Sequence, residues 1–284
     1  MRRSFALLTT LLAAAGCAGH AAAPASGSAP TTSPRPAATA ADPTALRYSA
    51  NAGRYRLEQT MHIAQDVMGN VTEIDASTTM LISTAVAAAE AGNLAAVFTV
   101  DSVSVTSSMP GAADAAAGSR GKTWRSVITP LGRSVAFTPP DTAVVTGQTG
   151  ELFREFLPVI PASLAPGSTW VDTVRATPNQ PGLTIRSQSI RQHQVMGWEV
   201  HDGTRAVKIA TTSAITISGE GESQGQQLQM GGTGTSVAER FISAAGVFLA
   251  GTMRDSTNLN VSVVSAGIDI PVRQVRRSTI TRLP

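Results

Sequence analysis

The chain has 284 residues, of which 42% are hydrophobic and 4% aromatic, and its net charge is +3. Two of the 22 basic residues, Arg2 and Arg3, lie in a segment that we expect to be cleaved, which leaves 20 basic against 19 acidic residues and a net charge of +1. A charge this close to zero gives nucleic-acid binding no electrostatic support. The apolar content is ample for a packed core in a chain of this length.

The first sixteen residues predict a secretory signal peptide. Arg2 and Arg3 precede an apolar run of eleven residues from Phe5 to Ala15. At about 1.5 Å per residue, this run is far shorter than the ~30 Å hydrocarbon core of a bilayer. It therefore predicts a cleaved signal over residues 1–16 and not a transmembrane helix.

The only cysteine, Cys17, follows this signal directly. It has no partner for an intramolecular disulfide, and a lone free thiol is unusual in an oxidising compartment. The stretch Ala14-Ala15-Gly16-Cys17 resembles a bacterial lipobox, in which small residues precede a cysteine that becomes the lipidated N-terminus. The resemblance implies a lipid anchor on Cys17, and the alternative is an ordinary signal peptide with a cysteine nearby.

Residues 18–44 consist mainly of Ala, Pro, Ser, Thr and Gly. A segment with so few large apolar side chains cannot offset its ordering entropy, so we expect it to be a disordered tether. With Cys17 it forms the predicted anchor region 17–44. Its root-mean-square reach would be roughly 30 Å, enough to hold a folded domain off a membrane surface.

Residues 45–145 predict long antiparallel strands, because apolar and polar side chains alternate with a period of two. The alternation is clearest in three runs, Tyr55–Ile63, Ile74–Val86 and Ala95–Thr106. A Gly/Ala-rich loop is expected at 110–121, and a short hairpin at 122–138. Consecutive strands this long favour a meander that bends into a curved sheet or half-barrel.

The pattern changes at residues 149–157, which predict the one helix of the fold. Four apolar side chains share one stripe of this helix: Leu152, Phe153, Phe156 and Leu157. Thr149 is the expected N-cap, and Pro158 is expected to end the helix. The stripe could line a ligand site as a lid over the concave face, or it could plug the core, and both roles require the same side chains.

Residues 165–284 return to strands with a period of two. Gly197 is expected to separate two of these strands, and the Gly-rich residues 219–235 are expected to form a loop. The whole pattern predicts a fold dominated by β structure, with one covering helix and a single domain over 45–284. The halves 45–145 and 165–284 follow a similar plan, and the helix joins them.

Residues Gly221–Gly225 match the G-x-S-x-G pattern of a hydrolase nucleophile, with Ser223 at its centre. That motif requires a strand, a tight turn and a helix, with a histidine later in the chain. The flanks here predict strands, and no histidine follows His201. The match is therefore interpreted as chance, and we expect no catalytic residue, no cofactor and no enzymatic activity.

His193 and His201 flank Trp198 on what the sequence predicts to be adjacent strands. A structural metal site needs three or four converging ligands. Two histidines without a cysteine fall short of that number, so they are interpreted as residues of a strand face, and no metal is expected.

Four arginines gather on the last predicted strand: Arg273, Arg276, Arg277 and Arg282. They could attract anionic lipid head groups. They could also be solvated charges that discourage edge-to-edge pairing of the sheet, and this second interpretation is favoured.

The segment Phe156–Pro161, followed by Pro166–Trp170, completes a pattern of lipobox, spacer, long strands and one helix. The pattern resembles uncharacterised bacterial lipoproteins and, more distantly, half-barrel carriers of the LolA, LolB and LppX type. Those carriers hold acyl chains in an apolar concavity, which is what the resemblance implies here. No ligand residue of the carriers can be assigned to this chain.

The sequence therefore predicts a non-enzymatic lipoprotein of a bacterial envelope, anchored by lipid on the periplasmic face of the outer membrane. Its concave face would bind a lipid or another apolar ligand, since an open curved sheet must fill its concavity. The alternative is a module that presents sheet edges, or residues 219–235, to an envelope protein partner.

Overall fold

The computed structural model describes residues 44–161, 163–177, 179–180, 182–223 and 225–284. The predicted signal peptide, Cys17 and the tether up to residue 43 lie outside the described residues. Neither of the α-helices described below has the length and hydrophobicity of a membrane-spanning segment.

Twelve strands form one antiparallel sheet, which confirms the predicted fold class. The strands are β1 (Asn51–Val67), β2 (Asn70–Ala88), β3 (Leu94–Ser107), β4 (Thr123–Ile128), β5 (Ser134–Thr138), β6 (Thr169–Ala176), β7 (Asn179–Gln180), β8 (Leu183–His201), β9 (Thr204–Ser223), β10 (Gln226–Ser243), β11 (Phe248–Val263) and β12 (Ile268–Leu283). Their order is β5-β4-β3-β2-β1-β12-β11-β10-β9-β8-β6, with β7 paired to β8. The helices are α1 (Ala112–Ala117) and α2 (Val144–Arg154). Short 3-10 turns lie at Glu90–Gly92 and Val264–Ala266.

The first and last strands are neighbours at the middle of the sheet. β1 pairs with β12 over a long register that runs from Arg54 opposite Leu283 to Gln65 opposite Val272. The two predicted halves are therefore continuous in a single sheet, whose edge strands are β5 and β6.

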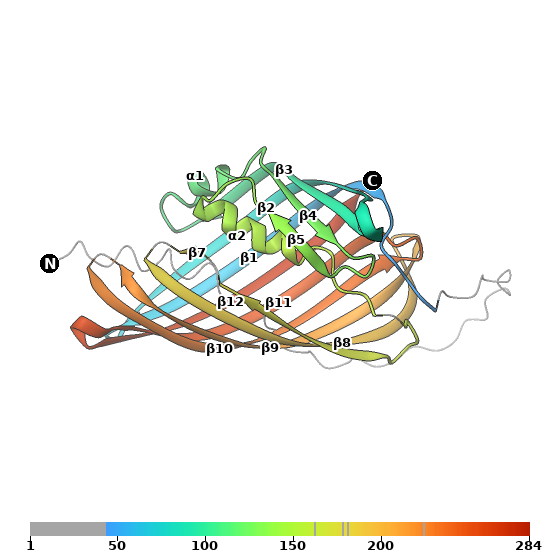
Figure 1. The fold of residues 1–284 in the computed structure, drawn as a ribbon. Helices are drawn as coiled ribbons and strands as arrows, with labels where there is room; N and C mark the ends of the chain where they lie inside the picture. Colours follow the sequence, from blue (N-terminus) through green and yellow to red (C-terminus); the bar gives the residue numbers. More distant parts are fainter. Residues whose placement is uncertain (1–43, 162, 178, 181, 224) are drawn as a thin grey trace, which may run out of the picture.

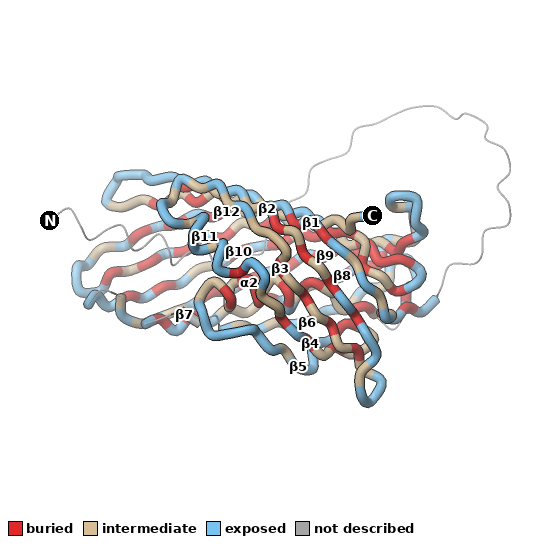
Figure 2. Tube along the Cα trace, turned by 90° about the horizontal axis from the view of Figure 1, so that it is seen from above, coloured by how far each residue is buried: buried red, intermediate tan, exposed pale blue. Residues whose placement is uncertain are grey.

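The sheet bends into a trough, and α2 lies over its concave side together with β4 and β5 (Figure 1). Along β12, Ile270 and Val272 are buried while Pro271 and Arg273 are exposed. Figure 2 shows the same alternation of buried and exposed residues along other strands. A period of two thus gives the sheet an inner and an outer face.

An aromatic cluster fills the trough beneath α2. Phe153 stacks on Phe98 with ring centroids 5.0 Å apart, and Phe156 contacts Tyr55 edge to face at 5.0 Å. Trp124 also lies 5.0 Å from Phe153, and its indole N–H donates to the carbonyl of Thr146 in α2. The side chains of this end of the trough therefore pack on each other around the helix.

The helix does not have its predicted bounds. It begins five residues before Thr149, which sits inside α2 and donates its hydroxyl to the carbonyl of Val145. It ends at Arg154, before Phe156 and Leu157. The added turn before Thr149 packs on the sheet, because the indole N–H of Trp124 donates to the carbonyl of Thr146. Gly150 disfavours helices but fits there, since a Cβ would lie only 3.3 Å from the indole nitrogen of Trp124.

The Phe156–Pro161 segment connects α2 to the strands that follow it. The hydroxyl of Tyr48 donates to the carbonyl of Pro158, and the N–H of Ile160 donates to the carbonyl of Leu131. Ile160 and Leu164 are buried in the aromatic cluster. The motif is thus a packed connection rather than part of a helix.

Three other predictions were wrong. The expected loop at 110–121 contains the short helix α1. Gly197 does not separate two strands; it lies at a bulge inside β8 with φ +130°. Residues 219–223 form the end of β9 and residues 226–235 the start of β10 instead of a loop, since the two strands pair with each other and with their outer neighbours β8 and β11.

Candidate functional site

A second apolar cluster fills the inner face at the end of the sheet where β11 turns into β12. Its buried members come from seven strands: Ile63, Ile74, Leu183, Ile185, Ile215, Ile217, Leu228, Met230, Leu259, Val261, Val263, Ile270 and Val272. Between this cluster and the aromatic cluster, the inner face is polar. We call these side chains the polar layer: Ser189, His193, Thr211, Ser213, Ser236, Asp255, Thr257, Gln274 and Arg276.

An ion pair lies at the centre of the polar layer. Asp255 and Arg276 are direct partners across β11 and β12, and Nε of Arg276 lies 2.8 Å from Oδ2 of Asp255. Asp255 is fully buried. Burial raises the pKa of Asp255 from 3.8 to about 6, against the opposing charge and hydrogen bond of Arg276.

Next to this pair, buried polar atoms have no hydrogen-bond partner among the described residues. They are Oδ1 of Asp255, Oγ1 of Thr257, both amide atoms of Gln274, and Oε1 of Gln65 on the adjacent β1. Thr257 and Gln274 are direct cross-strand partners, two residues along each strand from the ion pair. Each unpaired buried group costs about 1–3 kcal/mol, so the layer favours water or the polar part of a ligand.

The polar layer extends to a second group of contacts on β6, β8 and β9. His193 is buried, with Nδ1 2.9 Å from the hydroxyl of Thr211 and Nε2 3.3 Å from Oδ1 of Asp172. Trp170 stacks on the imidazole at 4.7 Å. Burial opposes ionisation of Asp172, but the contact with His193, together with the charges of His193, Arg191 and Arg133, outweighs it and lowers the pKa of that carboxyl.

Hydroxyl, imidazole and carboxylate occur here in the order of a nucleophile, a base and an orienting acid. Thr211 and His193 are direct partners within the sheet, however, and both are buried. Neighbouring side chains of the inner face cover the hydroxyl, so a substrate has no access to it in this structure. The arrangement is therefore a cross-strand polar contact, which sequence reasoning about the histidines did not anticipate.

The other candidate residues of the sequence do not converge. His201 lies on the same strand as His193, against Phe241, and not on an adjacent strand. Within the described ranges, no three side chains of His, Cys, Asp or Glu form a group that could hold a metal ion. β9 ends at Ser223 and β10 begins at Gln226, so no helix follows the G-x-S-x-G serine.

The four arginines of β12 do not form one cluster. Arg276 points into the polar layer, whereas Arg273 and Arg277 lie on the outer face. Arg282 donates to the carbonyl of Ala52. The alternation along the strand separates side chains that are close in sequence.

The four predicted lining residues all pack in the aromatic cluster beneath α2. Phe153 and Phe156 are only 2% exposed, and Leu152 and Leu157 are partly buried against the same cluster. The polar layer was missed, although a signal for it exists. Gln274 and Arg276 occupy the alternating positions that begin with Ile270 and Val272, so inward-facing polar residues could have been read from the period of two.

No family model matches the chain, and no curated protein matches it. Among solved structures, Neisserial surface protein A is 6% identical, with 82% of this chain and 99% of that chain covered and a TM-score of 0.23. A variant of the Rhodopseudomonas blastica porin is 9% identical, with 81% and 100% covered and a TM-score of 0.24. OccK5 (OpdH) of Pseudomonas aeruginosa is 6% identical, with 82% and 99% covered and a TM-score of 0.28. Similarities this low carry no argument about what this chain does.

Proposed function

We propose that this chain is a non-enzymatic, lipid-anchored protein of a bacterial envelope that holds an amphipathic ligand on the concave face of its sheet. The observation that carries the proposal is the set of unpartnered, buried polar atoms around Thr257 and Gln274, between two apolar clusters. The predicted anchor at Cys17 would place the protein at the outer membrane, on its periplasmic side.

The second apolar cluster is the better place for the apolar part of such a ligand. The first cluster is closed by Phe153 and Phe156, whereas the second is bordered by partly buried Met61 and Met109. Methionine side chains are flexible and repack readily around a guest. A short acyl chain could therefore displace them without disturbing α2.

The polar layer favours a neutral, hydroxyl-bearing head group. Asp255 is already paired with Arg276, so an additional buried charge would be left without a partner. Oδ1 of Asp255 and the amide oxygens of Gln65 and Gln274 need hydrogen-bond donors. A hydroxyl group donates to these oxygens and accepts from the Gln274 amide.

Native mass spectrometry of the full-length protein, purified from bacterial membranes in mild detergent, tests this proposal. We expect a bound molecule on the wild type and at least about a tenfold lower bound fraction on Gln274→Leu, because the head group loses two hydrogen bonds. Thr279→Val, on the outer face of the same strand, is the matched control and should bind normally. A wild type without any bound molecule would contradict the proposal, and a Gln274→Leu variant less stable than that wild type would then indicate that water alone satisfies the amide.

A protein partner at the free edge of β6 is the second candidate function. Val171 on β6 is 62% exposed, and Ile190 and Val200 on the neighbouring β8 are also exposed. Exposed apolar side chains beside an unpaired strand edge favour strand addition by another chain. Capture of an envelope protein by the wild type but not by Val171→Glu would support this candidate, and equal capture by both would oppose it.

A further inference from the structure

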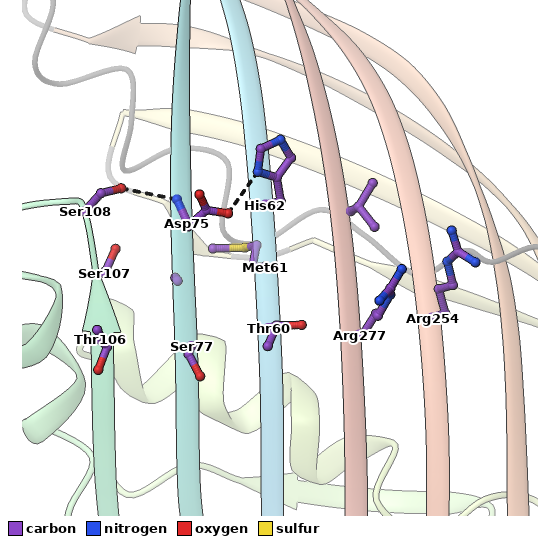
Figure 3. A pocket seen from close by; sticks show the side chains of 12 residues that line it. Thr60, Met61, His62, Asp75, Ser77, Thr106, Ser107, Ser108, Arg254 and Arg277 are labelled. Atoms are coloured by element: carbon purple, nitrogen blue, oxygen red, sulfur yellow. Dashed lines mark hydrogen bonds and ion pairs between the residues drawn. The ribbon is translucent and has the colours of Figure 1, made fainter.

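A groove of about 690 Å³ crosses the outer face of the sheet, opposite the polar layer. It runs over β3, β2, β1, β12 and β11 (Figure 3). Five neighbouring strands at about 4.8 Å spacing make it about 19 Å across. Much of its lining is small hydroxyl side chains, including Thr60, Ser77 and Thr106.

Two arginines stand side by side at one end of this groove. Arg254 on β11 and Arg277 on β12 are direct cross-strand partners, and both are exposed. Figure 3 shows their side chains next to each other on the same face. Like charges directly opposite each other, with Cβ atoms about 4.5–5.5 Å apart, repel and destabilise the strand pair.

Nothing in the described part of the chain neutralises this pair. Neither Arg254 nor Arg277 makes an ion pair there, whereas the adjacent Arg276 is bound by Asp255 on the inner face. The groove has a carboxylate at its other end, but Asp75 contacts Nδ1 of His62 at 2.9 Å.

Two further carboxylates stand diagonal to the arginines on the outer face. Glu239 on β10 is engaged by Lys208 at 2.8 Å. Glu58 on β1 lies two residues from Thr60, the direct partner of Arg277, and within the described residues it forms no ion pair with Arg277. The guanidinium groups of Arg254 and Arg277 thus remain available to an anion from outside.

We propose that the Arg254–Arg277 pair and the hydroxyl-lined groove beside it form a binding site for the phosphate group of an organic phosphate ester. Two guanidinium groups on adjacent strands offer several N–H donors to one phosphate. Thr60 stands directly opposite Arg277 and adds a hydroxyl. The remaining length of the groove, lined by Ser77 and Thr106, would accept the hydroxyl-bearing organic part.

The ester could be a soluble metabolite or a lipid head group, so the test has two arms. In the first arm, inorganic phosphate and glycerol 3-phosphate are titrated into the full-length protein by calorimetry. We expect glycerol 3-phosphate to bind more tightly than inorganic phosphate, because it also fills the groove. In the second arm, the protein is sedimented with phosphatidylcholine vesicles that contain phosphatidylglycerol or lack it, with and without glycerol 3-phosphate as a competitor. Competition by the soluble ester assigns the lipid to the same site.

Arg254→Gln and Arg277→Gln should each weaken binding about tenfold, as expected for loss of a bidentate charge-assisted contact. Arg273→Gln is the matched control, because it removes the same charge from the outer face of β12 outside the groove. Both groove variants should also be at least as thermally stable as the wild type without ligand, since they relieve the repulsion. An equal loss of binding in Arg273→Gln, or unchanged binding in both groove variants, would overturn the proposal in favour of a diffuse charge effect. Absence of binding to both phosphates and to vesicles would also overturn it.

Discussion

Asp255 and Arg276 face each other across β11 and β12 inside the trough, with Oδ2 and Nε 2.8 Å apart and the carboxylate fully buried. The next inward-facing pair along these strands, Thr257 and Gln274, lacks hydrogen-bond partners for its polar atoms among the described residues. An ion pair and a pair without hydrogen-bond partners thus stand side by side on the inner face. Because the first pair is charged and paired while the second is uncharged and unpartnered, substitutions in the two pairs should change the free energy of unfolding in opposite directions.

Asp255→Leu should lower the free energy of unfolding by at least about 3 kcal/mol near pH 7, because it removes both the counter-charge and the hydrogen-bond acceptor of the Arg276 guanidinium. Equilibrium unfolding in urea measures this loss. The double variant Asp255→Leu/Arg276→Met removes both charges and should lie much closer to the wild type. A double variant as unstable as the single one would show that the ion pair itself is not the cause.

The same carboxyl should make stability depend on pH in an unusual direction. Its pKa is about 6 in the folded chain against an ordinary value of 3.8, so the folded chain binds the proton more tightly. The free energy of unfolding contributed by this group is therefore highest below about pH 4 and falls as the pH rises through about 6, by about 3 kcal/mol. Urea unfolding across this window should show the fall in the wild type and not in Asp255→Asn. Parallel pH profiles for the two proteins would contradict the prediction.

Thr257→Val should stabilise the ligand-free protein by about 1 kcal/mol, because it replaces an unpartnered buried hydroxyl with a methyl group of the same shape. Thermal unfolding of protein stripped of lipid by detergent exchange measures the effect. Thr279→Val, exposed on the outer face of β12, should change stability by less than about 0.5 kcal/mol. A destabilised Thr257→Val would instead show that ordered water satisfies the hydroxyl.

Phe153→Ala should lower the free energy of unfolding by about 3–5 kcal/mol, as expected when a large aromatic side chain is removed from a packed core. Phe153 stacks on Phe98 and contacts Trp124, so the cavity would open inside the aromatic cluster. Leu152→Ala, only partly buried, should cost much less. If α2 were a movable lid, the Phe153 variant would keep its stability and change ligand binding alone.

The local sequence was sufficient to predict strands and the faces on which their side chains lie. In Tyr55–Ile63 and Ile268–Ile280, alternation alone predicts a strand and the faces of its side chains, because successive residues of a strand point to opposite sides. The same rule, applied to Gln274 and Arg276, places polar groups on the inner face. These properties depend only on the period of the backbone.

Tertiary structure decided the features that the two-residue alternation of apolar and polar side chains cannot predict. Gly197 and the Gly-rich residues 219–223 and 226–235 have weak local preferences, and pairing with neighbouring strands keeps them in strands. Gly150 occupies a helix position where Trp124 and Phe137 would crowd a Cβ at 3.3 Å. The meeting of Asp255 with Arg276 depends on the register between β11 and β12, which the turn at 264–267 and the packing of the inner face establish together. Register is a relation between strands, and the sequence of one strand does not contain it.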